Sequence, residues 1–130
     1  MEDAAWTTDP ARAKRVLDAP GKLGMTGAVF VPALDRYLLI GWYYPSGGGK
    51  MEGAAVRTVW DFYLSPKPWG PWSKIGSKEW RPQGYYSPQI CPKFTSPDGR
   101  RLFAATAGDW NTPQVYRLTF VPIHLDGKEK

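Results

Sequence analysis

Cysteine and histidine are almost absent from this chain of 130 residues, which contains one of each, Cys91 and His124. A single thiol excludes an intrachain disulfide, and one cysteine alone cannot build a thiolate metal site. We therefore predict that Cys91 is a small buried side chain. No serine or cysteine has an evident basic partner, so a nucleophilic triad is not expected. We expect neither a metal nor a cofactor.

Long apolar runs and basic clusters are also missing. No segment approaches the roughly 20 apolar residues of a membrane helix, and the N-terminus lacks the basic and apolar regions of a signal peptide. The formal net charge is +5, but the basic residues are scattered, and the nearest grouping is Arg12, Lys14 and Arg15. These absences argue against a membrane or nucleic-acid partner and leave the compartment undefined.

Proline, glycine and aromatic residues are abundant, with 13 Pro, 14 Gly, seven Trp and seven Tyr. This composition favours short strands joined by turns. Apolar runs predict a first group of strands at 27–32, 36–44, 56–64 and 72–77, and a second group at 87–94, 102–107 and 114–122. A capping Asp9 before Pro10 indicates a helix start, with 11–17 as either two helical turns or irregular chain.

The stretch 61–75 organises the first group. It begins as an aromatic strand, and Pro66 and Pro68 then remove the backbone donors that further pairing would need. The turn Trp69-Gly70-Pro71-Trp72 follows, and a short polar strand comes after it. This order is typical of the end of a propeller blade, where we expect Trp69 and Trp72 to be structural. A proline-rich surface loop is the alternative.

The two groups of strands correspond to one another, since Asp35-Arg36-Tyr37-Leu38-Leu39 aligns with Gly99-Arg100-Arg101-Leu102-Phe103. Each of these segments follows a strand and a predicted turn, at 33–35 and 97–99. Repeated meanders predict an all-β fold of about two four-stranded antiparallel propeller blades. The blades would span 25–80 and 81–125, the second incomplete, after a lead-in at 1–24 and before a frayed tail at 126–130. A β-sandwich is the competing fold.

Three motifs together carry a family resemblance: Arg36-Tyr37-Leu38-Leu39, Pro68-Trp69-Gly70-Pro71-Trp72, and Lys93-Phe94 before Ser96-Pro97-Asp98-Gly99. With them, the chain resembles the C-terminal part of glycosidase-like five-bladed propellers in a family catalogued as a domain of unknown function. Some members of that family look like endo-D-arabinanases. The resemblance implies a carbohydrate partner. Because such a propeller needs about 40 or more residues per blade, we expect this chain to be a fragment that is inactive alone.

Glycoside hydrolysis usually requires two carboxyl groups. Turn, cap and terminal positions account for most acidic residues and leave four others: Glu52, Asp61, Glu79 and Asp109. The weak catalytic candidates are Asp61, Glu79 and Asp109. The expected innermost strands, 27–32 and 87–94, contain no carboxylate, so a complete catalytic pair is not expected.

Aromatic side chains can still contact sugar rings, with nearby polar groups fixing the hydroxyls. The aromatic candidates are Trp42, Tyr43, Tyr85, Tyr86 and Trp110, and Lys93 on an expected inner strand could donate to a hydroxyl or carboxylate. Core packing is the alternative for each of them. Together with these candidates, the resemblance implies carbohydrate binding or processing by the complete protein. The alternative is a non-catalytic carbohydrate-binding or interaction module that self-associates through exposed blade edges.

Overall fold

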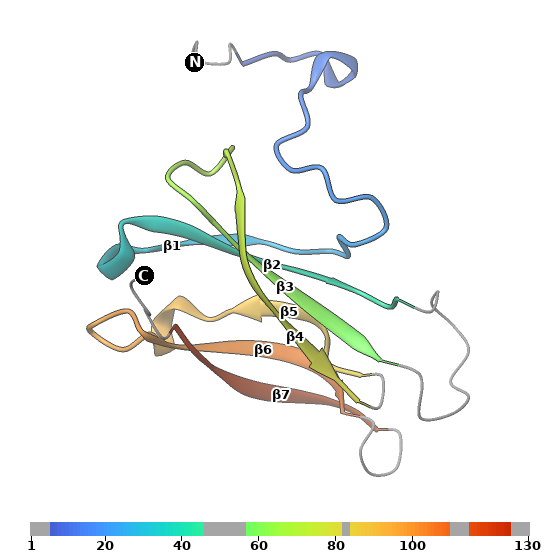
Figure 1. Cartoon of the computed structure of the whole chain (residues 1–130), viewed down its shortest axis with the longest axis vertical. Helices are drawn as coiled ribbons and strands as arrows, with labels where there is room; N and C mark the ends of the chain where they lie inside the picture. The colour runs from blue at the N-terminus through green and yellow to red at the C-terminus, as the bar shows by residue number, and fades with distance from the viewer. Residues whose placement is uncertain (1–5, 46–56, 82–83, 110–114, 126–130) are drawn as a thin grey trace.

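The computed structural model of the chain describes residues 6–45, 57–81, 84–109 and 115–125 (Figure 1). The fold is all-β, as predicted, and contains two antiparallel sheets. The first sheet orders β1 (Ala28–Val31), β2 (Arg36–Tyr43), β3 (Thr58–Ser65) and β4 (Ser73–Trp80) as they occur in the chain. The second orders β5 (Tyr86–Ile90), β6 (Arg101–Asp109) and β7 (Val115–His124) in the same way. Both sheets are therefore simple meanders.

The core lies between the two sheets. Alternating residues of the central strands point into it, because side chains on a strand alternate between the two faces. Leu38, Ile40 and Trp60 from the first sheet are at most 1% exposed. They form one buried cluster with second-sheet residues that include Leu102 and Ala104. Burial of each large apolar side chain stabilises the fold by roughly 1.5 to 3 kcal/mol.

The packing of the sheets bears on the choice between sandwich and propeller. Leu38 and Leu102 occupy equivalent positions in the two predicted repeats, and both are buried in the same core from opposite sheets. In a propeller, equivalent residues of successive blades would point to different interfaces. Like faces that pack together are the arrangement of a β-sandwich. The second sheet has three strands in the described residues, the number predicted for the incomplete second group.

The two predicted turns contact each other. Pro32–Leu34 form a 3-10 turn (η2) that ends at Asp35 in a left-handed conformation, φ 49°. In the other turn, Asp98 Oδ1 accepts hydrogen bonds from Ser96 Oγ and from the Arg100 N–H, which lower the pKa of Asp98. Gly99 has φ +67°, and a Cβ there would lie 2.4 Å from that of Ala33. Glycine is therefore required both by the turn and by its neighbour.

Two predicted elements are shorter than expected. Asp9 does cap a turn, accepting from the Ala11 N–H at 2.9 Å, but this turn is the 3-10 segment η1 (Pro10–Arg12), not a helix through 17. None of its residues is buried, so no tertiary packing supports a longer helix. The strand predicted at 87–94 ends at Ile90, because Pro92 has no N–H for the ladder and begins the 3-10 turn η3 (Pro92–Phe94).

Cys91 is less buried than expected, and Trp69 packs at the surface. Cys91 is partly exposed, between β5 and η3. Trp69 is 43% exposed and meets the ring of Trp6 edge-on at 5.8 Å, so it covers the chain's N-terminal segment and not the core. Trp72 is half-buried.

The sheets diverge at their outer strands. A mostly apolar cleft of about 700 Å³ lies between β4 and β7, lined by side chains that include Trp60, Trp80 and Ile123. Elsewhere, β5 of the second sheet lies against β2 of the first. The outward face of the first sheet is crossed by the N-terminal segment, and this crossing creates the candidate site.

Candidate functional site

The register of the first sheet places two rows of residues on its outward face. Tyr43, Val59 and Glu79 lie side by side across β2, β3 and β4, and Gly41, Asp61 and Ser77 form the next row. These residues alternate with the core residues along each strand. The outward face therefore carries polar and charged side chains, among them Asp61, Ser77 and Glu79, where the inward face is mainly apolar.

The segment 20–24 passes over these rows and is held there by its backbone. The Gly24 N–H donates to the Trp42 carbonyl at 2.8 Å. A Cβ on Gly41 would lie 2.8 Å from Leu23 Cδ2 and 3.3 Å from the Lys22 carbonyl oxygen. Glycine at position 41 thus permits the close approach. Between the segment and the strands lies a cavity of about 420 Å³.

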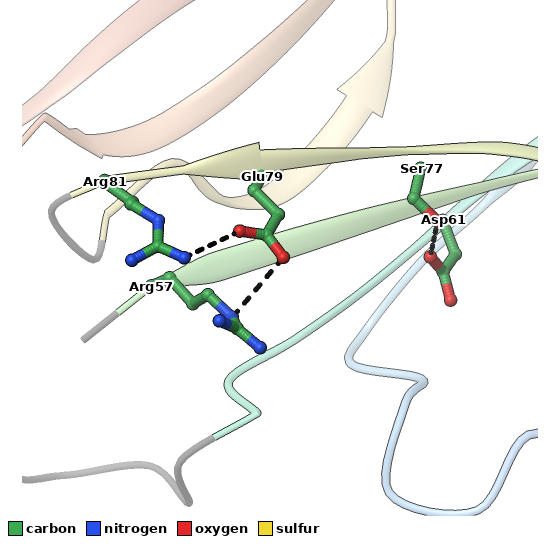
Figure 2. Close-up of polar contacts among 5 residues, drawn as sticks. All are labelled: Arg57, Asp61, Ser77, Glu79 and Arg81. Atoms are coloured by element: carbon green, nitrogen blue, oxygen red, sulfur yellow. Dashed lines mark hydrogen bonds and ion pairs between the residues drawn. The ribbon is translucent and has the colours of Figure 1, made fainter. Parts of the chain in front are cut away.

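Aromatic and charged side chains line this cavity, chief among them Lys22, Tyr43, Tyr44, Arg57, Ser77 and Glu79. Lys22 Nζ lies 5.8 Å from the centre of the Tyr43 ring, within range of a cation–π contact. Glu79 is held between two arginines, with Oε1 3.5 Å from Arg57 Nε and Oε2 3.1 Å from an Arg81 guanidinium nitrogen (Figure 2).

Asp61 lies next to the cavity but is only 1% exposed. Its Oδ1 accepts from Ser77 Oγ at 2.6 Å and lies 2.8 Å from Lys74 Nζ. Its Oδ2 is buried without a hydrogen-bond partner in the described part of the chain. The hydrogen bond to Asp61 raises the pKa of Lys74. The pKa of Tyr63 is also raised, mainly because the side chain is buried and to a smaller extent because the negative charge of Asp61 lies nearby. Asp61 therefore anchors a half-buried ion pair between β3 and β4.

A row of four aromatic rings leads from the cavity to the second sheet. The ring centre of Tyr44, which lines the cavity, lies 5.3 Å from that of Trp42. The ring centres of Trp42 and Tyr86 are 5.8 Å apart, and those of Tyr86 and Tyr116 are 5.9 Å apart. Trp42 is fixed by a 3.0 Å hydrogen bond from its indole N–H to the Met25 carbonyl. Burial and the hydrogen bond with Tyr116 raise the pKa of Tyr86 to about 12.

The backbone around Tyr86 is strained. Tyr85 and Ser87 adopt left-handed conformations with φ of 51° and 50°, and each such residue costs on the order of 1 to 3 kcal/mol. Hydrogen bonds hold the segment in place: the Tyr85 carbonyl accepts from Trp60 Nε1 at 2.6 Å, and the Tyr86 carbonyl accepts from Thr106 Oγ1 at 2.7 Å. Strain that the surroundings enforce in this way is found preferentially at ligand sites.

The predicted ligand-binding residues have different placements. Tyr43 lines the cavity, and Trp42 and Tyr86 belong to the aromatic row. Tyr85 stacks on Trp80 at 4.6 Å and packs against the core. Lys93 is exposed on η3, beyond the opposite end of β5, and not on an inner strand as predicted.

For two of the predicted site residues, Asp109 and Trp110, the side chain is not among the described parts of the structure. Trp110 lies outside the described residues, and Asp109 ends β6 without a described side chain. Sequence reasoning also missed several residues of the site: Lys22, Tyr44, Arg57, Ser77 and Tyr116. Only the strand register and the crossing of 20–24 bring them together, and neither can be read from local pattern.

The geometry favours binding over proton transfer. Asp61 and Glu79 lie on one face of adjacent strands, but Lys74 pairs with the first and two arginines pair with the second. Both carboxylates are therefore engaged in ion pairs, whereas glycoside hydrolysis uses one carboxyl group as a general acid and the other as a base or nucleophile.

No group of three or more potential metal ligands occurs among the described residues. No helix in that part of the chain is long and apolar enough to cross a membrane. The chain matches no family model, no curated protein and no solved structure.

Proposed function

We propose that this chain binds carbohydrate through the cavity and the aromatic row that continues from it, and does not hydrolyse it alone. We call this site the Tyr44 corner: Lys22, Tyr43, Arg57, Ser77 and Glu79 around the cavity, and Tyr44, Trp42, Tyr86 and Tyr116 along the row. The observation that carries the proposal is the continuity of the two parts through Tyr44. Aromatic faces pack against the apolar faces of sugar rings, and charged groups bind the hydroxyls.

The architecture of the proposed binding module is a pair of propeller blades. Three features support it: both sheets are meanders in chain order, β5 lies against β2, and a cleft opens between the outer strands β4 and β7. The shared core position of Leu38 and Leu102 favours the β-sandwich alternative.

Binding is tested with immobilised arabinan and arabinogalactan, and the reducing ends released are assayed in parallel. Tyr44→Ala should weaken binding about tenfold, the equivalent of 1.4 kcal/mol. Tyr37→Ala, which removes the same kind of ring from β2 where it lies against Phe30, is the matched control and should leave binding unchanged. Failure of the natural chain to bind any polysaccharide would refute the proposal. Turnover that Asp61→Asn or Glu79→Gln abolishes would make the chain an enzyme.

A second function, self-association, is favoured by one surface. Phe94, Tyr116, Leu118 and Phe120 are 48 to 72% exposed and cover the face of the second sheet that points away from the core. Exposed apolar faces of this kind mark interaction sites. The outer strand β4 instead carries exposed Lys74 and Lys78, which disfavour pairing of strand edges. Light scattering of the natural chain and of Leu118→Glu tests whether this face, and not an edge, holds copies together.

A further inference from the structure

Positive charge exceeds negative charge around the cavity of the Tyr44 corner. Among the described residues Glu79 is the one carboxylate that lines it, and Arg81 lies 3.1 Å from one of its oxygens. Arg57 and Lys22 also line the cavity. The neighbouring Asp61 is already paired with Lys74. Two cations therefore remain around the cavity beyond the one that Glu79 neutralises.

Neither of these cations makes a close hydrogen bond to a carboxylate within the described residues. Arg57 Nε is buried and lies 3.5 Å from Glu79 Oε1, too far for a good hydrogen bond, and it has no other partner in the described residues. Within the same residues Lys22 has no carboxylate partner, and its ammonium group meets only the Tyr43 ring. A buried donor without an acceptor is costly, and an anionic ligand group would supply one.

We infer that the Tyr44 corner prefers acidic carbohydrate, in particular sugars whose carboxylate can reach Arg57 and Lys22. The inference rests on the proposed carbohydrate binding and adds the class of sugar. A planar guanidinium matches a carboxylate through two parallel hydrogen bonds, and an ammonium group adds a point charge. The ring of the same sugar unit would lie against Tyr43 or Tyr44, which line the cavity beside these cations.

The test compares an oligogalacturonide with its methyl ester, because esterification removes the charge and keeps the sugar and its linkages. Calorimetry at low salt should give about tenfold tighter binding of the acid, the range expected for hydrogen bonds to charged groups. Added salt should reduce this ratio, since surface charges are screened. A sulfated oligosaccharide in a third arm should not reproduce the ratio.

Three variants locate the effect. Arg57→Gln and Lys22→Gln should each bring the acid-to-ester ratio close to one while binding of the ester persists. Lys93→Gln removes the same charge from exposed η3 and should leave the ratio unchanged. Circular dichroism checks that each variant is folded. If Arg57→Gln does not fold, Lys22→Gln still tests the inference.

The outcomes separate this inference from the proposed function. Equal binding of acid and ester overturns the inference and leaves carbohydrate binding in place, whereas no binding of either ligand or of neutral glycans refutes both. If the acid-to-ester ratio fell as much in Lys93→Gln as in Arg57→Gln and Lys22→Gln, the preference would come from the overall positive charge. That result would overturn the inference of a local site. Equal enhancement by the sulfated sugar would overturn the preference for carboxylate.

Discussion

The two faces of β3 are buried to similar extents but differ in chemistry. On β3, Trp60 is 0% exposed and Asp61 is 1% exposed, yet one lies in the intersheet core and the other in an ion pair under the 20–24 segment. Burial alone therefore does not identify the hydrophobic core. The inward face stabilises the fold, and the outward face positions charged and aromatic groups that can meet a ligand.

The largest effect should come from the inward face. Leu102 is fully buried, and Leu102→Ala should destabilise the fold by about 2 to 5 kcal/mol through lost contacts and a cavity. Urea denaturation measures this change. Leu118→Ala, at a site 68% exposed, is the control and should change stability by less than about 0.5 kcal/mol. Similar losses in both variants would mean that the core does not lie between the sheets.

A smaller loss of stability is expected when the ion pair on the outward face is removed. Asp61→Asn keeps the side-chain volume but removes the charge that meets Lys74 and Ser77. Because Lys74 is 46% exposed and can turn to water, the loss should be about 2 kcal/mol, below that of breaking a fully buried pair. Thermal unfolding compares it with Asp18→Asn, which removes an exposed pair with Arg15 and should have little effect.

Gly24→Ala should loosen the cover of the site. A Cβ there would lie 2.3 Å from the indole of Trp42, so the 20–24 segment or the ring must move. We expect a loss of about 1 kcal/mol, accompanied by weaker sugar binding than in the natural chain. Gly76→Ala, where no atom lies within 4 Å, is the control for adding a methyl group. If sugar binding were unaltered in Gly24→Ala, the aromatic row would not be part of the binding site.

The smallest effect near neutral pH concerns Tyr86. Burial and Tyr116 raise its pKa from 10.0 to about 12, so the unfolded chain releases this proton at lower pH than the folded chain does. Stability should be unaffected below pH 10 and should fall as the pH rises from 10 toward 12. Tyr86→Phe should flatten this part of the pH profile of denaturant midpoints. A profile unchanged by the substitution would show that Tyr86 titrates normally.

Local pattern was enough to predict the strands and the tight turns. The run 36–44 became β2 because apolar residues fill it without a break, and Gly99 takes the positive φ that its turn requires. The effect of proline was harder to predict. The strand predicted at 87–94 extends four residues beyond the end of β5 at Ile90, because Pro92 begins a 3-10 turn.

The candidate site was only partly predictable because it depends on contacts between distant residues. Tyr43 and Tyr86 stood out as aromatic residues near strand ends. Lys22 and Arg57 gave no such signal, and they reach one cavity only because β2, β3 and the 20–24 segment meet there. Trp69 depends on a distant residue in the same way, since its ring packs edge-on against Trp6 and is 43% exposed.

The single, partly exposed thiol of Cys91 is a ready attachment point for a spin label, with no other cysteine to remove. It follows β5 at the end opposite Tyr86, so a label there is separated from the aromatic row by the length of the strand, roughly 16 Å. If two copies associate, each carries one nitroxide. A single interspin distance distribution from pulsed electron paramagnetic resonance would then report how the copies are arranged.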